Sequence, residues 1–354
     1  MSWVRKLARP EITALDACVP GPRPEAVLLD ANEVWEDTAG NAHGLNRYPA
    51  PMNGICARLA PRYGVTPAQI LLARGSDDGI DALTRAFCRA GHDAVQVMPP
   101  TFPMYTLAAR IQGAEVISTP RSLPDFELDV AQVLEDWRPA AKLVFVCTPN
   151  NPTGNEVAGQ DIQRLCRALA GKALVVVDEA YGEFSGAQSA AHYLDEYPNL
   201  VVLRTLSKAW ALAAERCGVL LAHHEVINLT RQVLPPYPLA ASSLVAAAQS
   251  MEANAQSRMQ MRISHVAAER ARLTQAFASL PAARRVYPSA ANFLLVKFVT
   301  AAGVHRALLA AGVRVRDFKA TEAGLENCLR ITIGSTAEND RLLAVLKEFE
   351  GTCA

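Results

Sequence analysis

Three apolar stretches of the sequence decide the fold: Leu143-Val144-Phe145-Val146-Cys147, Ala173-Leu174-Val175-Val176-Val177 and Leu200-Val201-Val202-Leu203. No polar residue alternates within any of them. Such continuous runs are typical of strands buried on both faces, as in a parallel sheet. A helical pattern over 161–170 lies between the first two runs, and this order of strand, helix and strand favours an α/β fold.

The same alternation extends toward the N-terminus. Short strands are predicted at 70–72, 94–98 and 114–117. A helical pattern over 80–87 and a second one over 104–113 separate these strands, since their apolar residues recur on one face. We therefore predict a large domain, residues 46–245, built on a mostly parallel sheet.

The last third of the chain follows a different pattern. A long helix containing Met251 and Met259 is expected to end near Leu280. After it we expect a helix and three strands, at 304–311 and at 292–297, 313–315 and 329–333. Ser335 and Glu338 have the spacing of a capping box, which predicts the start of a last helix. These elements predict a smaller α+β domain, residues 246–354.

The first 45 residues are rich in proline and glycine and show little periodicity. They predict an N-terminal arm, residues 1–45, that packs with the small domain. One short strand is expected in it at 26–29.

Composition excludes several classes of protein. The 354 residues include 35 Lys+Arg and 35 Asp+Glu, so the chain has no cationic excess for nucleic acid or a membrane surface. No run of 18 apolar residues and no secretory signal is present. No two of the eight cysteines lie within four positions of each other, which excludes CxxC pairs and favours the reducing cytosol. The sequence contains no HExxH, GxGxxG or P-loop motif. We therefore expect no metal. The glycine motif that usually indicates a nicotinamide dehydrogenase is also absent.

Polar residues follow four of the predicted strands. These clusters are Arg74–Asp77, Thr148–Gly154, Asp178–Tyr181 and Arg204–Lys208. Because ligands bind at the carboxyl ends of the strands in open α/β sheets, we expect the clusters to form one site. A desolvated lysine is the amine that forms Schiff bases. Lys208 beside groups suited to a phosphate, a phenolate and a ring nitrogen therefore predicts pyridoxal phosphate (PLP) as the cofactor.

Three of these motifs resemble those of fold-type I PLP enzymes. They are Thr205-Leu206-Ser207-Lys208 with Arg216, Asn151-Pro152-Thr153-Gly154 and Asp178-Glu179-Ala180-Tyr181. Four further stretches narrow the resemblance to the histidinol-phosphate aminotransferase family: 46–49, 99–102, 203–209 and 328–334. The resemblance covers about 29–349. It implies a seven-stranded, mostly parallel sheet in the large domain and a homodimer with shared active sites.

The motif matches imply a role for each site residue. The catalytic residues are Lys208, Asp178 and Tyr181, with Asp178 facing the ring nitrogen and Tyr181, with Asn151, bonding the ring hydroxyl. The cofactor phosphate is expected on the backbone N–H groups of Ser76 and Asp77 and on Thr205, Ser207 and Arg216. Phe102 would stack on the ring, and Tyr48 would reach the phosphate of the neighbouring subunit. Substrate binding falls to Arg330, Arg316, Asn32 and Asn151.

The implied reaction is transamination between L-histidinol phosphate and 2-oxoglutarate, in histidine biosynthesis. An aromatic aminotransferase and a threonine-phosphate-type decarboxylase remain as alternatives, because both would keep every cofactor residue. A PLP-fold effector domain of a transcription regulator is disfavoured, since the chain has no room for a DNA-binding domain before Tyr48.

Two positions depart from the family. Ala214-Glu215 replaces Gly-Leu before Arg216, and the tyrosine expected near Leu15 or Asp16 is absent. The missing tyrosine bears on the choice of substrate more than on the type of reaction.

Overall fold

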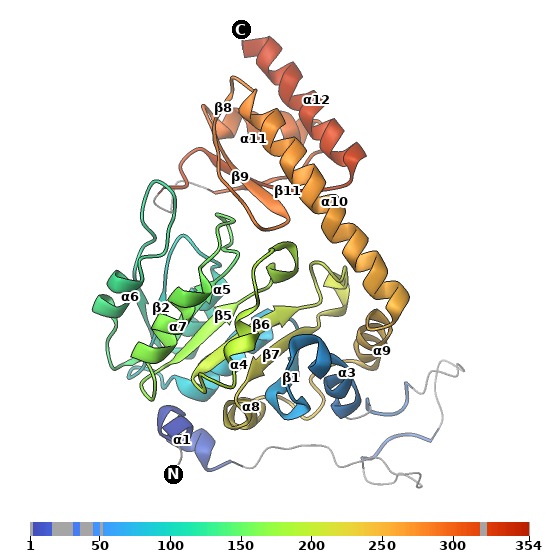
Figure 1. The fold of residues 1–354 in the computed structure, drawn as a ribbon. Coiled ribbons are helices and arrows are strands. Elements are labelled where there is room, and N and C mark those ends of the chain that lie inside the picture. Colours follow the sequence, from blue (N-terminus) through green and yellow to red (C-terminus); the bar gives the residue numbers. More distant parts are fainter. Residues whose placement is uncertain (1–2, 16–30, 36–44, 50–51, 319–323, 354) are drawn as a thin grey trace.

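A computed structural model describes residues 3–15, 31–35, 45–49, 52–318 and 324–353 (Figure 1). The helices are α1 (Trp3–Leu7), α2 (Pro10–Thr13), α3 (Asn53–Tyr63), α4 (Ser76–Phe87), α5 (Met104–Gln112), α6 (Val130–Asp136), α7 (Gly159–Ala168), α8 (His224–Arg231), α9 (Ala241–Ser250), α10 (Ala253–Ala278), α11 (Ala301–Ala310) and α12 (Thr336–Cys353). The strands are β1 (Ile70–Ala73), β2 (Ala94–Val97), β3 (Glu115–Ser118), β4 (Ala141–Cys147), β5 (Leu174–Asp178), β6 (Leu200–Thr205), β7 (Gly218–Ala222), β8 (Ala283–Val286), β9 (Phe293–Phe298), β10 (Arg316–Asp317) and β11 (Cys328–Thr332).

The large domain is built on a seven-stranded sheet in the order β1-β7-β6-β5-β4-β2-β3. Only β7, which our sequence analysis did not identify, runs antiparallel to its neighbours. Since β1 and β6 are both antiparallel to β7, they run in the same direction as β4 and β5. The predicted mostly parallel sheet is confirmed, and the four polar clusters that follow β1, β4, β5 and β6 share one edge.

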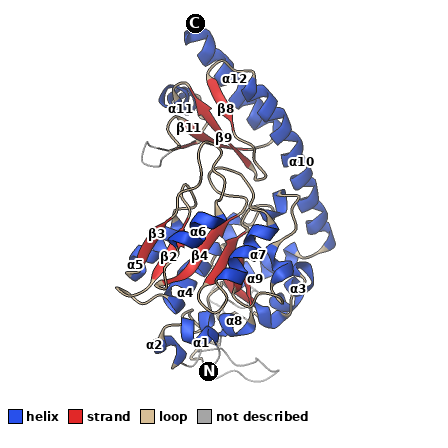
Figure 2. Cartoon of the chain, turned by 60° about the vertical axis from the view of Figure 1, so that its left-hand side comes forward, coloured by secondary structure: helices blue, strands red, loops and turns tan. Residues whose placement is uncertain are grey.

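Both faces of this sheet are buried, which explains the continuous apolar runs. Alternate residues of β5 enter different cores: Val175 and Val177 face one side, and Leu174 and Val176 face the other. Residues of α3, α6, α7 and α9 complete the first core, and residues of α1, α4, α5 and α8 complete the second. Figure 2 shows these helices around the sheet.

The small domain contains an antiparallel sheet in the order β10-β11-β9-β8. Helices α11 and α12 and the C-terminal part of α10 pack on it through an apolar core of their own. The strand predicted at 313–315 was wrong by a few residues, because the pairing with β11 begins at Arg316. The capping box is confirmed: Glu338 N donates to Ser335 Oγ, and Ser335 N donates to Glu338 Oε2 at 2.8 Å.

The predicted division at 245/246 falls inside α9, which belongs to the large domain. Leu244 and Ala247 of α9 lie in the core of that domain, as does Met259 of α10. Further along α10, Leu273 and Phe277 lie in the small-domain core. Helix α10 therefore connects the two domains, and Figure 1 shows it running along both. The single long helix that we predicted is two helices, which meet at Met251 and Glu252.

The first described segment packs on the large domain, contrary to the predicted contact of the arm with the small domain. Val4 and Leu7 enter the same core as residues of α4 and α8. The Arg9 N–H also donates to Ala86 O at 3.0 Å. Figure 1 shows α1 beside α8, at the end of the molecule far from the small domain. The strand predicted at 26–29 lies outside the described residues.

Candidate active site

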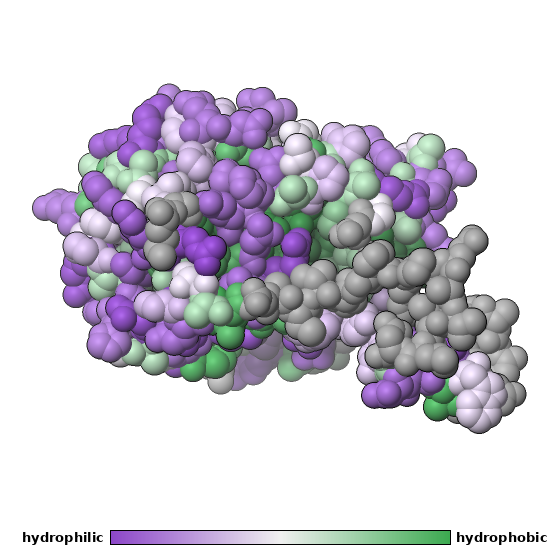
Figure 3. Space-filling view, turned by 90° about the horizontal axis from the view of Figure 1, so that it is seen from below, coloured by the Kyte–Doolittle hydropathy of each residue, from purple (hydrophilic) through white to green (hydrophobic). Residues whose placement is uncertain are grey.

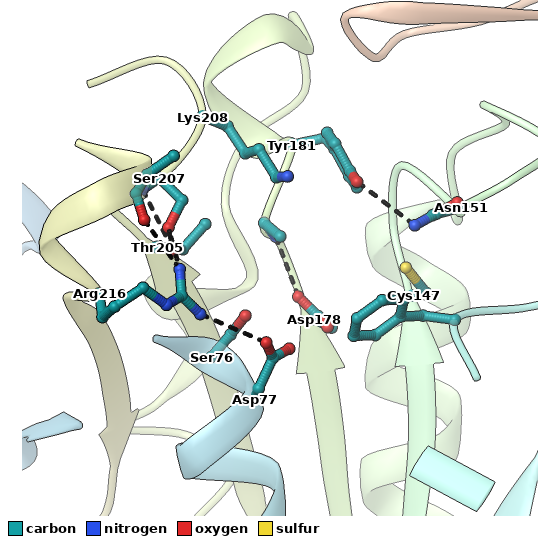
Figure 4. Close-up of a pocket in the computed structure, with 13 residues that line it drawn as sticks. Ser76, Asp77, Cys147, Asn151, Asp178, Tyr181, Thr205, Ser207, Lys208 and Arg216 are labelled. Carbon is teal, nitrogen blue, oxygen red and sulfur yellow. Dashed lines mark hydrogen bonds and ion pairs between the residues drawn. The ribbon is translucent and has the colours of Figure 1, made fainter. Parts of the chain in front are cut away.

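A pocket lies at the shared carboxyl edge of the large sheet (Figure 4). The pocket encloses about 580 Å³ including its open mouth. Its lining residues are Ser76, Asp77, Phe102, Cys147, Asn151, Asp178, Ala180, Tyr181, Thr205, Ser207, Lys208, Ala213 and Arg216. Ten of the residues that we predicted from sequence are therefore brought together from five separate segments.

One end of the pocket is suited to an anion. Helix α4 begins at Ser76, and its N-cap residue Gly75 has no side chain to cap the first N–H groups. The Arg216 guanidinium donates to Ser207 Oγ at 3.3 Å and lies 3.4 Å from Asp77 Oδ2. Figure 4 shows Arg216 and Ser207 together on this side of the pocket.

Two glycines, Gly75 and Gly218, allow the start of α4 and the start of β7 to approach each other closely at this end of the pocket. A Cβ on Gly218 would lie 2.2 Å from the carbonyl carbon of Gly75, and a Cβ on Gly75 would lie 2.6 Å from Arg216 Nη2. Gly75 also has a φ of +85°, which disfavours other residues. The close approach leaves the backbone N–H groups accessible to a ligand.

Asp178 ends β5 at the floor of the pocket and is almost fully buried. Its Oδ2 accepts a hydrogen bond from Tyr105 OH at 2.7 Å, and its Oδ1 accepts one from Ala180 N at 3.0 Å. Burial raises the pKa of this carboxyl to about 6, although both hydrogen bonds lower it. A cation or an N–H group of a ligand would stabilise the charged form of this buried carboxylate.

The Lys208 amine lies between the two sides of the pocket. Its Nζ is 5.6 Å from the centre of the Tyr181 ring, and Figure 4 shows it pointing toward that residue. Asn151 Nδ2 donates to the Tyr181 hydroxyl at 3.3 Å. Burial lowers the pKa of Lys208, and the positive charge of Arg330 lowers it further. More of the amine is therefore neutral and nucleophilic near pH 7 than for an exposed lysine.

Arg330 reaches the pocket from the small domain. Its Nη1 donates to Asn151 Oδ1, and its guanidinium lies 5.3 Å from the centre of the Phe293 ring. Arg316 on β10 pairs with Arg330 across the sheet, so the two backbones are neighbours. Burial lowers the pKa of Arg330, and the charge of Arg316 lowers it further. Two arginines therefore stand on adjacent strands of the small domain, and one of them contacts a residue of the pocket.

Four predicted site residues do not line this pocket. Arg330 and Arg316 lie on β11 and β10 of the small domain. Tyr48 and Asn32 line a separate hollow, together with Ala240 and Ala241. Tyr48 is half exposed and stacks on Tyr237 with ring centroids 4.5 Å apart. In this chain, neither residue belongs to the pocket that contains Lys208.

Glu215 does not pair with Arg216, the arginine that we expected to bind the phosphate. Among the described residues, the side-chain contacts of Arg216 are with Asp77, Ser207 and the carbonyl of Ala213. Arg216 itself has a φ of +50°, so the backbone turns sharply between it and Glu215.

Sequence reasoning missed Tyr105 and Cys147. Tyr105 is fully buried and stacks on Phe145 at 4.7 Å, with Phe102 against its edge. Tyr105 lies in the first turn of the helix that follows β2, and Cys147 is the last residue of β4. Their positions at the carboxyl ends of two strands are the signal that could have identified them.

Neither a metal site nor a membrane helix is found in the described part of the chain. No group of three or more His, Cys, Asp or Glu side chains there could hold a metal ion. No helix of the described segments is long and apolar enough to cross a membrane.

Comparison with known proteins gives consistent matches over most of the chain. Residues 19–346 match the family of class I and II aminotransferases. A histidinol-phosphate aminotransferase of Xanthomonas axonopodis pv. citri is 46% identical over 333 residues, covering 93% of this chain and 92% of the relative. That of Stenotrophomonas maltophilia is 46% identical over 357 residues, covering 97% and 96%.

The fold matches solved structures as well. The crystal structure of histidinol-phosphate aminotransferase from Sinorhizobium meliloti, in complex with pyridoxal-5'-phosphate, aligns with a TM-score of 0.80 at 26% identity. The alignment covers 87% of this chain and 84% of that chain.

Proposed function

The chain belongs to the class I and II aminotransferases, and we propose that it transfers the amino group between L-histidinol phosphate and 2-oxoglutarate. The products are imidazole acetol phosphate and L-glutamate, and the reaction is a step of histidine biosynthesis. The enzyme is PLP-dependent and has the fold-type I architecture. The observation that carries the choice of substrate is that Arg216 lines the pocket of Lys208 and that a second arginine, Arg330, contacts Asn151, another residue of that pocket.

The residues of the pocket fit this cofactor. A phosphate needs N–H donors and a cation, which the start of α4 and Arg216 supply. A protonated ring nitrogen needs a carboxylate, and Asp178 is the buried carboxylate of the pocket floor. When bound, PLP supplies a carbonyl carbon for an amine and a ring that withdraws electrons from the substrate Cα.

Each pocket residue then has one task. The phosphate would be held by the N–H groups of Ser76 and Asp77, the hydroxyls of Thr205 and Ser207, and Arg216. Asp178 would keep the ring nitrogen protonated, Tyr181 and Asn151 would hydrogen-bond the ring hydroxyl, and Phe102 would pack on the ring face.

Lys208 is the general base and acid of the reaction. With PLP bound, its free amine would take the proton from the substrate Cα and would later give it up as the acid. The lowered pKa makes the neutral amine available for the first of these transfers. Tyr181, whose ring faces the amine at 5.6 Å, limits the positions that the amine can occupy.

Arg330 and Arg316 bind the anionic end of the substrate. The phosphate of histidinol phosphate and the distal carboxylate of 2-oxoglutarate carry the same sign of charge, so one arginine pair serves both half-reactions. Asn151 joins this end to the cofactor end through its contacts with Arg330 and Tyr181. Asn32 stays a prediction as a substrate residue.

A single half-reaction followed by absorbance tests the function. Protein loaded with PLP, without any oxo acid, is mixed with L-histidinol phosphate, L-phenylalanine or L-threonine O-phosphate. We expect loss of the absorbance band of the lysine-bound cofactor with histidinol phosphate at far lower concentration than with phenylalanine. Equal reaction of phenylalanine would indicate an aromatic aminotransferase, and release of CO₂ from threonine phosphate would indicate a decarboxylase.

Replacing Arg330 by lysine should lower kcat/KM for histidinol phosphate by about 10²-fold, because lysine lacks the planar pair of donors that binds an oxyanion. Reaction with unphosphorylated histidinol should change much less. Arg314→Ala is the matched control, since Arg314 lines a different hollow. A loss of the same size for both amines would show that Arg330 does not read the phosphate.

We also propose that the enzyme is a homodimer in the cytosol, with Tyr48 completing the pocket of the partner subunit. Tyr48 and the nearby apolar side chains of Leu45 and Trp35 are exposed in the single chain, Trp35 at 83%. Figure 3 shows hydrophilic and hydrophobic residues mixed over the face of the molecule that is seen from below. The six cysteines with described side chains are free, in keeping with a reducing compartment.

Mixing two inactive variants tests the shared site. Lys208→Ala and Tyr48→Phe subunits, unfolded and refolded together, should form mixed dimers that regain part of the wild-type rate. Sedimentation at twice the 38.1 kDa mass should accompany this. A monomer, or no regain of activity in mixed dimers, would contradict the proposal.

A further inference from the structure

A buried network of charges joins β6 to the loop after β5, close in sequence to Tyr181 and Lys208. Arg204 of β6 forms ion pairs with Glu179 Oε2 at 2.6 Å and with Glu183 Oε1 at 2.7 Å. The side chains of all three residues are at most 8% exposed. None of them lies in the pocket that contains Lys208.

Glu183 makes a second contact from the same oxygen. The indole N–H of Trp210 donates to Glu183 Oε1 at 3.3 Å. Arg204 precedes Lys208 by four residues and Trp210 follows it by two. One carboxylate oxygen therefore holds the chain on both sides of the lysine.

The backbone of Glu183 belongs to the Tyr181 loop. Residues Gly182–Phe184 form a 3-10 turn whose N-cap residue is Tyr181. Arg204 lies tightly under this turn, because a Cβ on Gly182 would lie 2.5 Å from Arg204 Nη1. The loops after β5 and β6 are thus joined through the Glu183 side chain.

Neutralising Arg204 does not require Glu183. Glu179 already pairs with Arg204 and is itself held by Ser189 Oγ at 2.6 Å and Ala190 N at 2.7 Å. A second buried carboxylate leaves a net negative charge, which costs free energy of desolvation. Glu183 Oε2 also lacks a hydrogen-bond partner among the described residues. Charge balance therefore does not explain why an acid occupies this position.

We propose that Glu183 is a positioning residue that fixes the Lys208 amine against the Tyr181 hydroxyl, and that it acts on proton transfer rather than on binding. The proposal rests on the proposed function of Lys208 and Tyr181. It predicts that removing the link lets the two loops move apart, while Arg216 and Arg330 continue to hold their anions.

The test compares Glu183→Ala, Glu183→Gln and Trp210→Phe in the PLP-loaded protein. Glu183→Ala should lower the half-reaction rate constant at least about 10-fold and leave the half-saturating amine concentration within about threefold. Glu183→Gln keeps an acceptor oxygen and should recover most of this loss. Trp210→Phe removes only the hydrogen bond from the indole N–H to Glu183, so its rate constant should lie between those of wild type and Glu183→Ala.

Glu269→Ala is the matched control for a merely structural effect. Glu269 is a buried carboxylate of the small domain that binds Arg272 and Asn339, both at 2.6–2.7 Å. Its loss should lower thermal stability and leave the rate constant unchanged. A rate loss in Glu269→Ala equal to that in Glu183→Ala would overturn the proposal.

Two further readouts separate this proposal from the proposed function. The pH midpoint of the absorbance of lysine-bound PLP needs no substrate; it should move in Glu183→Ala and stay fixed in Glu269→Ala. In a Tyr181→Phe background, Glu183→Ala should cost much less than it does alone, because the two residues act together. An unmoved midpoint, or additive rate losses, would overturn the role of Glu183 even if histidinol phosphate proves to be the substrate.

Discussion

Replacing Lys208 by alanine should lower the rate of amino transfer by about 10³-fold or more. In the proposed function the amine moves the proton at the substrate Cα, and a positioned acid or base of this kind contributes about 10²–10⁴-fold. The loss also removes the covalent attachment of the cofactor. Binding should be much less affected, because the phosphate end at Ser76 and Arg216 is unchanged.

Single-turnover absorbance measures this effect directly. Lys208→Ala protein with added PLP and histidinol phosphate should convert the cofactor at the reduced rate, while equilibrium dialysis should still show bound PLP. Lys172→Ala is the matched control, since Lys172 is an exposed lysine at the opposite edge of the sheet, just before β5. A Lys208→Ala rate within tenfold of wild type would contradict the assignment of the general base.

Replacing Asp178 by asparagine should lower the half-reaction rate about 10²–10³-fold, the usual effect of removing one preorganised electrostatic contact from an active site. Asparagine has nearly the shape of aspartate, and its single side-chain oxygen can still accept one of the two hydrogen bonds, from Tyr105 or from Ala180. It has no charge, however, and cannot keep a ring nitrogen protonated. Without that proton the ring would withdraw electrons less strongly from the substrate Cα, so the transfer of the Cα proton would be slower.

The same substitution should stabilise the cofactor-free protein at alkaline pH. Burial raises the pKa of Asp178 from 3.8 to about 6, so the folded chain binds this proton more tightly than the unfolded chain does. The free energy of unfolding therefore falls as the pH rises from about 4 to about 6, by about 3 kcal/mol in all. Asp178→Asn does not undergo this loss and should be more stable than wild type at pH 8 by about that amount.

Urea unfolding of the cofactor-free proteins at pH 4 and pH 8 measures the difference. The advantage of Asp178→Asn should be large at pH 8, should shrink toward pH 4, and should be reduced when PLP is added to both proteins. Equal stability at pH 8, together with a normal half-reaction rate, would show that Asp178 is neither desolvated nor paired with the ring. The two measurements separate the cost of burying this carboxylate from its use in the reaction.

The sequence by itself determined the main sheet and the cofactor end of the site. Runs such as Val175–Val177 are apolar on every residue because both faces of β5 are covered, and this shows in a one-dimensional pattern. Asp178 ends β5 and Lys208 follows the end of β6, so the two residues must share an edge once the strands are parallel. The residues of such a motif lie within one strand and the loop after it. The motif can therefore be recognised in the sequence without the tertiary structure.

Tertiary structure alone decided the contacts between distant segments. The link from Arg330 to Asn151 joins two domains, and the hydrogen bond from Tyr105 to Asp178 joins α5 to β5. The break between α9 and α10 and the packing of α1 on the large domain were likewise missed. Each depends on which apolar faces meet after folding, and periodicity gives the face of a helix but not its partner. The Glu183 link belongs to the same class, since no spacing in the sequence relates that carboxylate to both Arg204 and Trp210.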